Sequence, residues 1–185
     1  MDVTGQFRPK KCVTNNKEYT MKKQGFTLIE LMVVIVIMGI LAAVAVPKLF
    51  GMIAKSKASE IGPAAGEYVK LQDAFISETG TTWGSWKYIG YKMETTNNVF
   101  KYTEENAPQS GTATLGSLTA VWKAQPKANL NDCTSAAGYW ELKLQKTSAA
   151  GGNGAEYKAH VKGDDCNVLV PGYGKLDITG AATID

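Results

Sequence analysis

The feature that most constrains this chain is a long apolar run near its N-terminus. Residues 26–47 read FTLIELMVVIVIMGILAAVAVP, and Glu30 is their only ionisable side chain. As an α-helix, this run would span about 33 Å, close to the thickness of a bilayer hydrocarbon core. The run is therefore a membrane segment or a targeting signal rather than the core helix of a soluble domain.

The composition of the whole chain is that of an ordinary globular protein. Its 185 residues accommodate one domain plus an extended element. Hydrophobic residues make up 44% and charged residues 20%, which excludes a disordered or collagen-like chain. A mean hydropathy of −0.15 excludes a protein with many membrane spans. The single histidine, His160, leaves little material for a histidine-based triad or a multi-histidine metal site.

The excess positive charge lies ahead of the apolar run. Residues 1–25 hold six basic and two acidic side chains, so the remaining 160 residues hold 14 basic and 15 acidic ones. A nucleic-acid partner is therefore not expected. Lys22 and Lys23, directly before the run, would instead keep its N-terminal end on the cytoplasmic side of a membrane.

Two common kinds of segment could account for the run. A secretory signal peptide would take Met21, Lys22 and Lys23 as its basic region and Ala43-Val44-Ala45 as its cleavage site. The second kind of segment is a plain N-terminal membrane anchor that is not cleaved. Neither needs Glu30, whose carboxylate costs about 2.5–3.5 kcal/mol on insertion scales.

A third hypothesis gives Glu30 a task. If the chain is cut between Gly25 and Phe26, the carboxylate lies four residues from a new α-amino group. In a bundle of identical helices, Glu30 of one copy could pair with the Phe26 amine of its neighbour. Because an unpaired charge in a dry helical core is expensive, only a stagger that forms this pair would be tolerated.

The stretch KKQGFTLIELMVVIVIMGILAAVAVPKL (residues 22–49) resembles the class III signal and N-terminal helix of type IV pilins. In that family, a prepilin peptidase cuts after a glycine, here Gly25, and N-methylates the new first residue, here Phe26. The family's glutamate corresponds to Glu30, and its helix-bending residues correspond to Gly39 and Pro47. The resemblance covers residues 22–50 and fades after about residue 60.

The resemblance implies a structural subunit of an extracellular pilus (fimbrium). Before assembly it would cross the inner membrane once, in contact with lipid and with its N-terminus in the cytoplasm. Its partners would be copies of itself, the prepilin peptidase, and the pilus assembly platform and motor. Adhesion, twitching and biofilm formation are roles of the family. A type II secretion pseudopilin, which shares this stretch, is the alternative, and a membrane-anchored binding protein that never polymerises is a second.

Residues 1–25 are predicted to be a leader that is removed. Pilins that start with phenylalanine have leaders of five or six residues, which Met21–Gly25 would supply. Residues 1–20 are polar and show no hydrophobic period, so we expect translation to begin at Met21 rather than Met1. A genuine long leader is the alternative.

The predicted fold class is α+β, a long N-terminal helix packed on a small antiparallel sheet. Residues 26–50 would be the transmembrane and filament-core helix, and residues 51–78 its amphipathic continuation, with a bend at Gly62-Pro63. We call residues 51–185 the headpiece. Within it, residues 79–116 would form an αβ-loop and residues 117–185 the sheet with a C-terminal disulfide loop.

Alternation with period two marks the strands of this sheet. It occurs in three segments, Leu118/Ala120/Trp122, Trp140/Leu142/Leu144 and Tyr157/Ala159/Val161. The residues SAAGGNG (148–154) would connect the last two strands as a hairpin. A short fourth strand is expected around 167–170.

Two cysteines are left once the leader, with Cys12, is removed. Cys133 and Cys166 would face an oxidising compartment, and we expect a disulfide, with two free thiols or a metal pair as alternatives. The disulfide would also resemble the C-terminal disulfide loop of many pilins.

No sequence pattern for an enzyme is present, so no catalytic residue, cofactor or metal is expected. Residues 172–175 are too short for phosphate binding, and Asp164-Asp165 suit a solvated turn better than a calcium site. Six aromatic residues lie between 83 and 102. Packing of the loop that connects helix to sheet, or contacts between subunits, are favoured for them over a platform for sugar rings.

Overall fold

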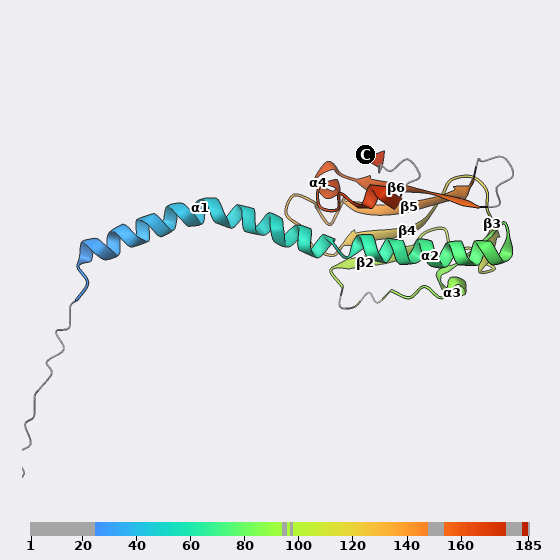
Figure 1. Cartoon of the computed structure of the whole chain (residues 1–185), viewed down its shortest axis with the longest axis horizontal. Coiled ribbons are helices and arrows are strands. Elements are labelled where there is room, and N and C mark those ends of the chain that lie inside the picture. The colour runs from blue at the N-terminus through green and yellow to red at the C-terminus, as the bar shows by residue number, and fades with distance from the viewer. Residues whose placement is uncertain (1–24, 94–95, 97, 148–153, 177–182, 185) are drawn as a thin grey trace, which may run out of the picture. The chain divides into compact units, whose positions relative to one another are not determined.

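The computed structural model describes residues 25–93, 96, 98–147, 154–176 and 183–184. The predicted leader, apart from Gly25, and most of the predicted 148–154 hairpin lie outside the described residues. By their contacts, residues divide into two compact units at the Ala42–Ala43 junction. Figure 1 shows the elements in chain order.

The predicted helix over residues 26–78 is present as two helices. The first, α1, covers Leu28–Ala58, and α2 covers Ile61–Thr79. Pro63 is the third residue of α2, and its ring would collide with the carbonyl group of Ser59, four residues earlier. The interruption at residues 59–60 therefore precedes Gly62-Pro63 by one turn.

Five strands form the main sheet, in the order β2-β4-β5-β6-β7. Neighbouring strands are antiparallel except β6 and β7, which are parallel. Strands β1 and β3 form a separate antiparallel pair. The strands are β1 (Thr82–Gly84), β2 (Phe100–Glu104), β3 (Thr112–Thr114), β4 (Thr119–Pro126), β5 (Tyr139–Lys146), β6 (Ala155–Lys162) and β7 (Thr183–Ile184). The α+β prediction is confirmed.

The structure differs from the expected strands in two places. Strands β1, β2 and β3 all come from within the segment 79–116 that was expected to be a loop. Residues 167–170 do not form a strand; instead, the short helix α4 (Asp164–Asn167) occupies the start of this region. Gly163, with φ +92°, turns the chain directly before α4, and both aspartates lie in the first turn, where a carboxylate is favourable. Two further short elements are α3 (Trp86–Ile89) and the 3₁₀ helix η1 (Tyr173–Leu176).

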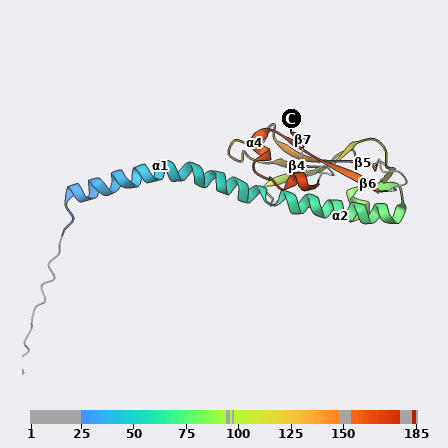
Figure 2. The same cartoon turned by 45° about the horizontal axis from the view of Figure 1, so that its top comes forward.

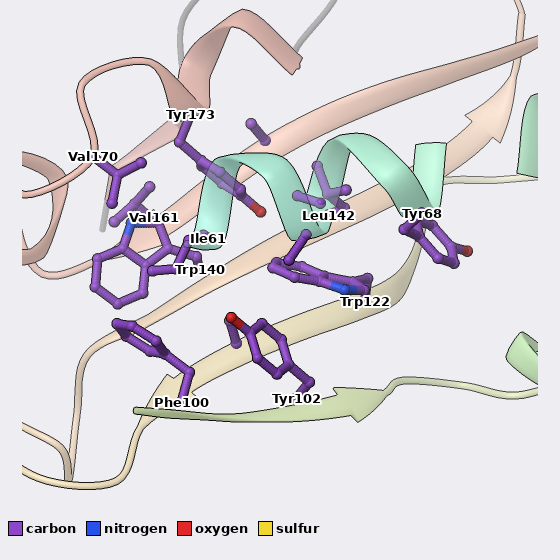
Figure 3. Close-up of a cluster of buried hydrophobic side chains, with 14 of the residues drawn as sticks. Ile61, Tyr68, Phe100, Tyr102, Trp122, Trp140, Leu142, Val161, Val170 and Tyr173 are labelled. Atoms are coloured by element: carbon purple, nitrogen blue, oxygen red, sulfur yellow. The ribbon is translucent and has the colours of Figure 1, made fainter. Parts of the chain in front are cut away.

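Aromatic side chains fill the space between α2 and the sheet. Helix α2 runs along one face of the sheet in both views (Figures 1 and 2). Tyr68 from α2, Trp122 from β4 and Trp140 from β5 are fully buried there (Figure 3). Two phenol groups add polar ties to the helix, since Tyr157 Oη donates to Asp73 Oδ1 at 2.8 Å and Tyr102 Oη donates to Glu60 Oε1 at 3.0 Å. The apolar stripe of α2 thus has the partner surface that the sequence required.

Candidate functional site

Helix α1 carries the candidate site, because its large apolar side chains are exposed in the part of the chain that the structure describes. Every large hydrophobic side chain from Phe26 to Ile53 is at least 41% exposed. One 18-residue window has a mean hydropathy of 2.9, which makes this helix long and apolar enough to cross a membrane. Soluble monomers rarely expose continuous apolar surface of this extent, so α1 requires lipid or other protein around it.

Glu30 lies in this apolar surface, at the start of α1, and is held by its own helix. The Thr27 backbone N–H and the Thr27 hydroxyl both donate to Glu30 Oε2, each at 2.8 Å. In return, the Glu30 backbone N–H donates to Thr27 Oγ1 at 3.3 Å. This reciprocal arrangement is a capping box, which satisfies backbone donors that the first turn of a helix leaves unpaired.

The predicted cleavage site precedes α1 and is accessible. Gly25 and Phe26 are outside the helix, both are exposed, and Phe26 is 83% exposed. A Cβ atom added at Gly25 would meet no atom within 4 Å. Packing among the described residues therefore does not require glycine at position 25.

Gly39 and Pro47 both lie inside α1, and the helix is continuous through them. A Cβ atom at Gly39 would also meet nothing within 4 Å. Pro47 lacks the N–H that would bond to the carbonyl group of residue 43, so the helix has one backbone hydrogen bond fewer at this point. The bends predicted at these two residues stay predictions.

The predicted disulfide between Cys133 and Cys166 is confirmed. Their Cα atoms lie 4.8 Å apart, and the bond joins the loop after β4 to α4. Gly138 packs directly against it: an added Cβ atom would lie 2.3 Å from Cys166 Sγ and 2.9 Å from Cys133 Sγ. Glycine at 138 is therefore a requirement of the disulfide.

The aromatic residues between 83 and 102 are largely internal. Trp83, Tyr91, Phe100 and Tyr102 are buried and Trp86 is half-buried, whereas Tyr88 is 57% exposed. A flat platform of several exposed rings is thus not formed by these six residues, which favours the packing interpretation.

Asp164 and Asp165 are exposed in the first turn of α4. In the part of the chain that the structure describes, no three His, Cys, Asp or Glu side chains are grouped so that they could hold a metal ion. The candidate site is therefore the surface of α1 and its capped start.

Thr27 is the functional side chain that the sequence analysis did not single out. Its signal was present, because threonine followed three residues later by glutamate, just before an apolar run, is the pattern of a capping box.

Comparison with known proteins places the matched motif on this same helix. The prokaryotic N-terminal methylation motif matches residues 20–46. The type IV major pilin protein PilA of Myxococcus xanthus is 46% identical over 57 residues, which are 31% of this chain and 26% of PilA. Fimbrial protein EcpC of Eikenella corrodens is 36% identical over 102 residues, 55% of this chain and 64% of EcpC.

The type IV major fimbrial protein FimA of Dichelobacter nodosus is 49% identical over 45 residues, 24% of this chain and 29% of FimA. The chain thus matches less than two thirds of the length of each of these relatives. No solved structure matches significantly. The relatives carry the names of pilins and fimbrial proteins, not of enzymes.

Proposed function

Since this chain bears the N-terminal methylation motif and the apolar helix of the type IV pilins, we propose that it is the structural subunit of an extracellular pilus. The leader would be cut after Gly25 by a prepilin peptidase, and Phe26 would be N-methylated. The chain would wait in the inner membrane through α1 until an assembly platform and its motor draw it into a filament of identical copies.

The exposed apolar surface of α1 is the observation that carries this proposal. Such a surface suits two successive environments, the bilayer and a bundle of identical helices. Because lipid tails are as apolar as leucine side chains, moving from one to the other changes hydrophobic free energy little. The exchange can therefore be driven from outside and still leave a stable fibre.

Register between subunits would come from Glu30. Apolar side chains alone permit many staggers of one helix against another, since they lack direction. A pair between the Glu30 carboxylate of one subunit and the Phe26 amine of the next selects one of them, because every other stagger leaves both charges unpaired in a dry core. Charge-assisted hydrogen bonds of this kind are short and directional.

Orientation follows from the flanking groups. Lys22 and Lys23 would keep the leader in the cytoplasm, where the peptidase would act. The headpiece would then fold on the outer side of the membrane. The Cys133–Cys166 disulfide fits that placement, because disulfides persist in oxidising compartments.

Substitution of Glu30→Ala tests this function. We expect filaments to fall at least about tenfold, because each interface loses a pair whose disruption costs about 3–5 kcal/mol. Sheared filaments and membranes would be quantified by immunoblot. Glu67→Ala, which removes an exposed carboxylate on α2, is the matched control and should leave filament yield unchanged.

Processing is checked in the same strains. Mass spectrometry should show N-methyl-Phe26 as the first residue in the wild type and in both variants. A first residue of Val46 would instead establish a secretory signal. Normal filament yield from Glu30→Ala would overturn the proposed assembly mechanism.

A further inference from the structure

We propose that Thr27 is a positioning residue for Glu30 during assembly, an inference that rests on the proposed function. Thr27 holds one carboxylate oxygen, Oε2, within its own helix and so presents the other, Oε1, to the Phe26 amine of the neighbouring subunit. One threonine side chain would then decide where the only carboxylate of the apolar surface points.

The hydrogen bonds at the start of α1 are unequally shared between the two carboxylate oxygens. Both donors of Thr27, its backbone N–H and its hydroxyl, bond to Oε2 at 2.8 Å. Among the described residues, no hydrogen bond reaches Oε1. The carboxylate is therefore fixed by one oxygen and has lone pairs to offer on the other.

The arrangement solves a problem that arises before any neighbour is present. A glutamate side chain has three rotatable bonds, and ordering them costs conformational entropy. In apolar surroundings, an ionised carboxylate without donors is also unfavourable. Thr27 supplies two donors from the same chain, so the carboxylate is partly satisfied and already oriented when the neighbour arrives.

Removal of the leader leaves this arrangement intact. The cut falls between Gly25 and Phe26, whereas the Thr27 N–H belongs to the next peptide bond, between Phe26 and Thr27. Cleavage therefore creates the amine that Oε1 is to accept without disturbing the bonds that hold Oε2. Precursor and mature chain can share one capped conformation.

The chemistry demands a hydroxyl at position 27. Thr27 Oγ1 accepts from the Glu30 N–H while it donates to Oε2. Serine can do both, and valine, which has nearly the shape of threonine, can do neither. Thr27→Val and Thr27→Ser therefore form a matched pair of variants.

A competition for places in the filament measures the effect. Tagged variants are expressed together with the untagged wild-type chain, and the tagged fraction in sheared filaments is divided by the tagged fraction in membranes. We expect this ratio to fall about tenfold for Thr27→Val, since the hydrogen bond from the hydroxyl to the charged carboxylate is lost. It should stay within about twofold of wild type for Thr27→Ser. Mass spectrometry should show the same N-methylated Phe26 throughout.

A double-mutant cycle separates positioning from plain helix capping. Thr27 also accepts from the backbone N–H of residue 30, and that N–H survives Glu30→Ala. If Thr27 acts through the carboxylate, adding Thr27→Val to Glu30→Ala lowers the ratio no further. If it acts only as a cap for the backbone, the two losses multiply, and the proposal is overturned.

The remaining outcomes also discriminate. A wild-type ratio for Thr27→Val would overturn the role of the hydroxyl, and so would an equal loss for Thr27→Ser. If Glu30→Ala is defective in the same experiment, the proposed function still stands. A wild-type ratio for Glu30→Ala overturns the proposed assembly mechanism, and this inference with it.

Discussion

A single buried hydroxyl shows how individual residues hold the headpiece together. Tyr91 Oη accepts from the indole N–H of Trp122 at 2.9 Å and donates to the carbonyl oxygen of Ala64 in α2 at 3.1 Å. Its ring packs edge-on against Tyr68, with centroids 5.5 Å apart. Burial raises the pKa of Tyr91 to about 12, although the Trp122 bond opposes the rise. The hydroxyl thus stays protonated and able to donate at neutral pH.

Substitution of Tyr91→Phe should lower the free energy of unfolding by about 1–3 kcal/mol, because it leaves the fully buried indole N–H of Trp122 without its partner. Urea unfolding of the mature chain in detergent, followed by tryptophan fluorescence, would measure this. Tyr88→Phe is the control, since that ring is mostly exposed, and should change stability by less than about 0.5 kcal/mol. Equal effects of the two substitutions would contradict the role of the buried hydroxyl.

At the scale of elements, the disulfide loop depends on one small residue. Gly138 lies on the turn before β5, and its backbone N–H donates to the carbonyl oxygen of Thr134 at 2.9 Å. The two sulfur atoms occupy the volume where a side chain at 138 would begin. Backbone on both sides of Gly138 is fixed, on one side by this turn and on the other by β5, so the chain has little freedom to move away.

Gly138→Ala should therefore destabilise the headpiece by about 1–3 kcal/mol or more, as overpacking does, and should leave a measurable fraction of Cys133 and Cys166 as free thiols. Thiol titration under denaturing conditions, with parallel urea unfolding, checks both expectations. In Gly172→Ala, by contrast, the new methyl group meets no atom within 4 Å. A fully oxidised Gly138→Ala protein as stable as this control would show that the loop can adjust.

Local patterns were sufficient to predict the two long helices and the three longest strands. The period-two segments became β4, β5 and β6, and the three- and four-residue steps became α2. The register shift between Ala120 and Trp122 in β4 is a local irregularity that alternation alone does not indicate. Strand β2 was missed because its five residues are too few for a clear alternating pattern, and only its pairing with β4 in the folded chain identifies it as a strand.

Some residues of the candidate site and of the disulfide loop could be predicted from the sequence, and others could not. Glu30 was conspicuous as a charge in an apolar run. The role of Gly138 could not be foreseen, because it arises from the disulfide, which brings Cys166 from a distant part of the chain next to Cys133 and Gly138. Composition and period report on neighbours in sequence, and such contacts join residues that are distant in it.

The molecule as a whole divides its hydrophobic residues between two tasks. Those of the headpiece core pack on one another, as fully buried Ile61 does. The large hydrophobic residues of α1 remain exposed, as Ile37 does at 52%. The first group should determine whether the chain folds, and the second whether the folded chain has a place in a membrane or a filament.

A crossed pair of substitutions tests this division. Ile61→Gln should lower the free energy of unfolding by about 3 kcal/mol or more, because an amide enters the core and apolar contacts are lost. Ile37→Gln should leave the urea midpoint of the headpiece unchanged in detergent and should reduce the yield of filaments. A lower midpoint for Ile37→Gln would show that α1 supports the fold of the headpiece.

We expect residues of the headpiece core and residues on the exposed surface of α1 to be substituted at different rates during evolution. A core residue such as Ile61 can be replaced if its few neighbours change with it, because all of them belong to one gene copy. In the proposed filament, a residue on the exposed surface of α1 would meet neighbouring copies of the chain, so one substitution there would be repeated at every interface of the fibre. The methylation motif matches residues 20–46 and overlaps this exposed surface, so we expect its sequence to change slowly. Over generations we therefore expect the surface of the headpiece to change more than the exposed surface of α1.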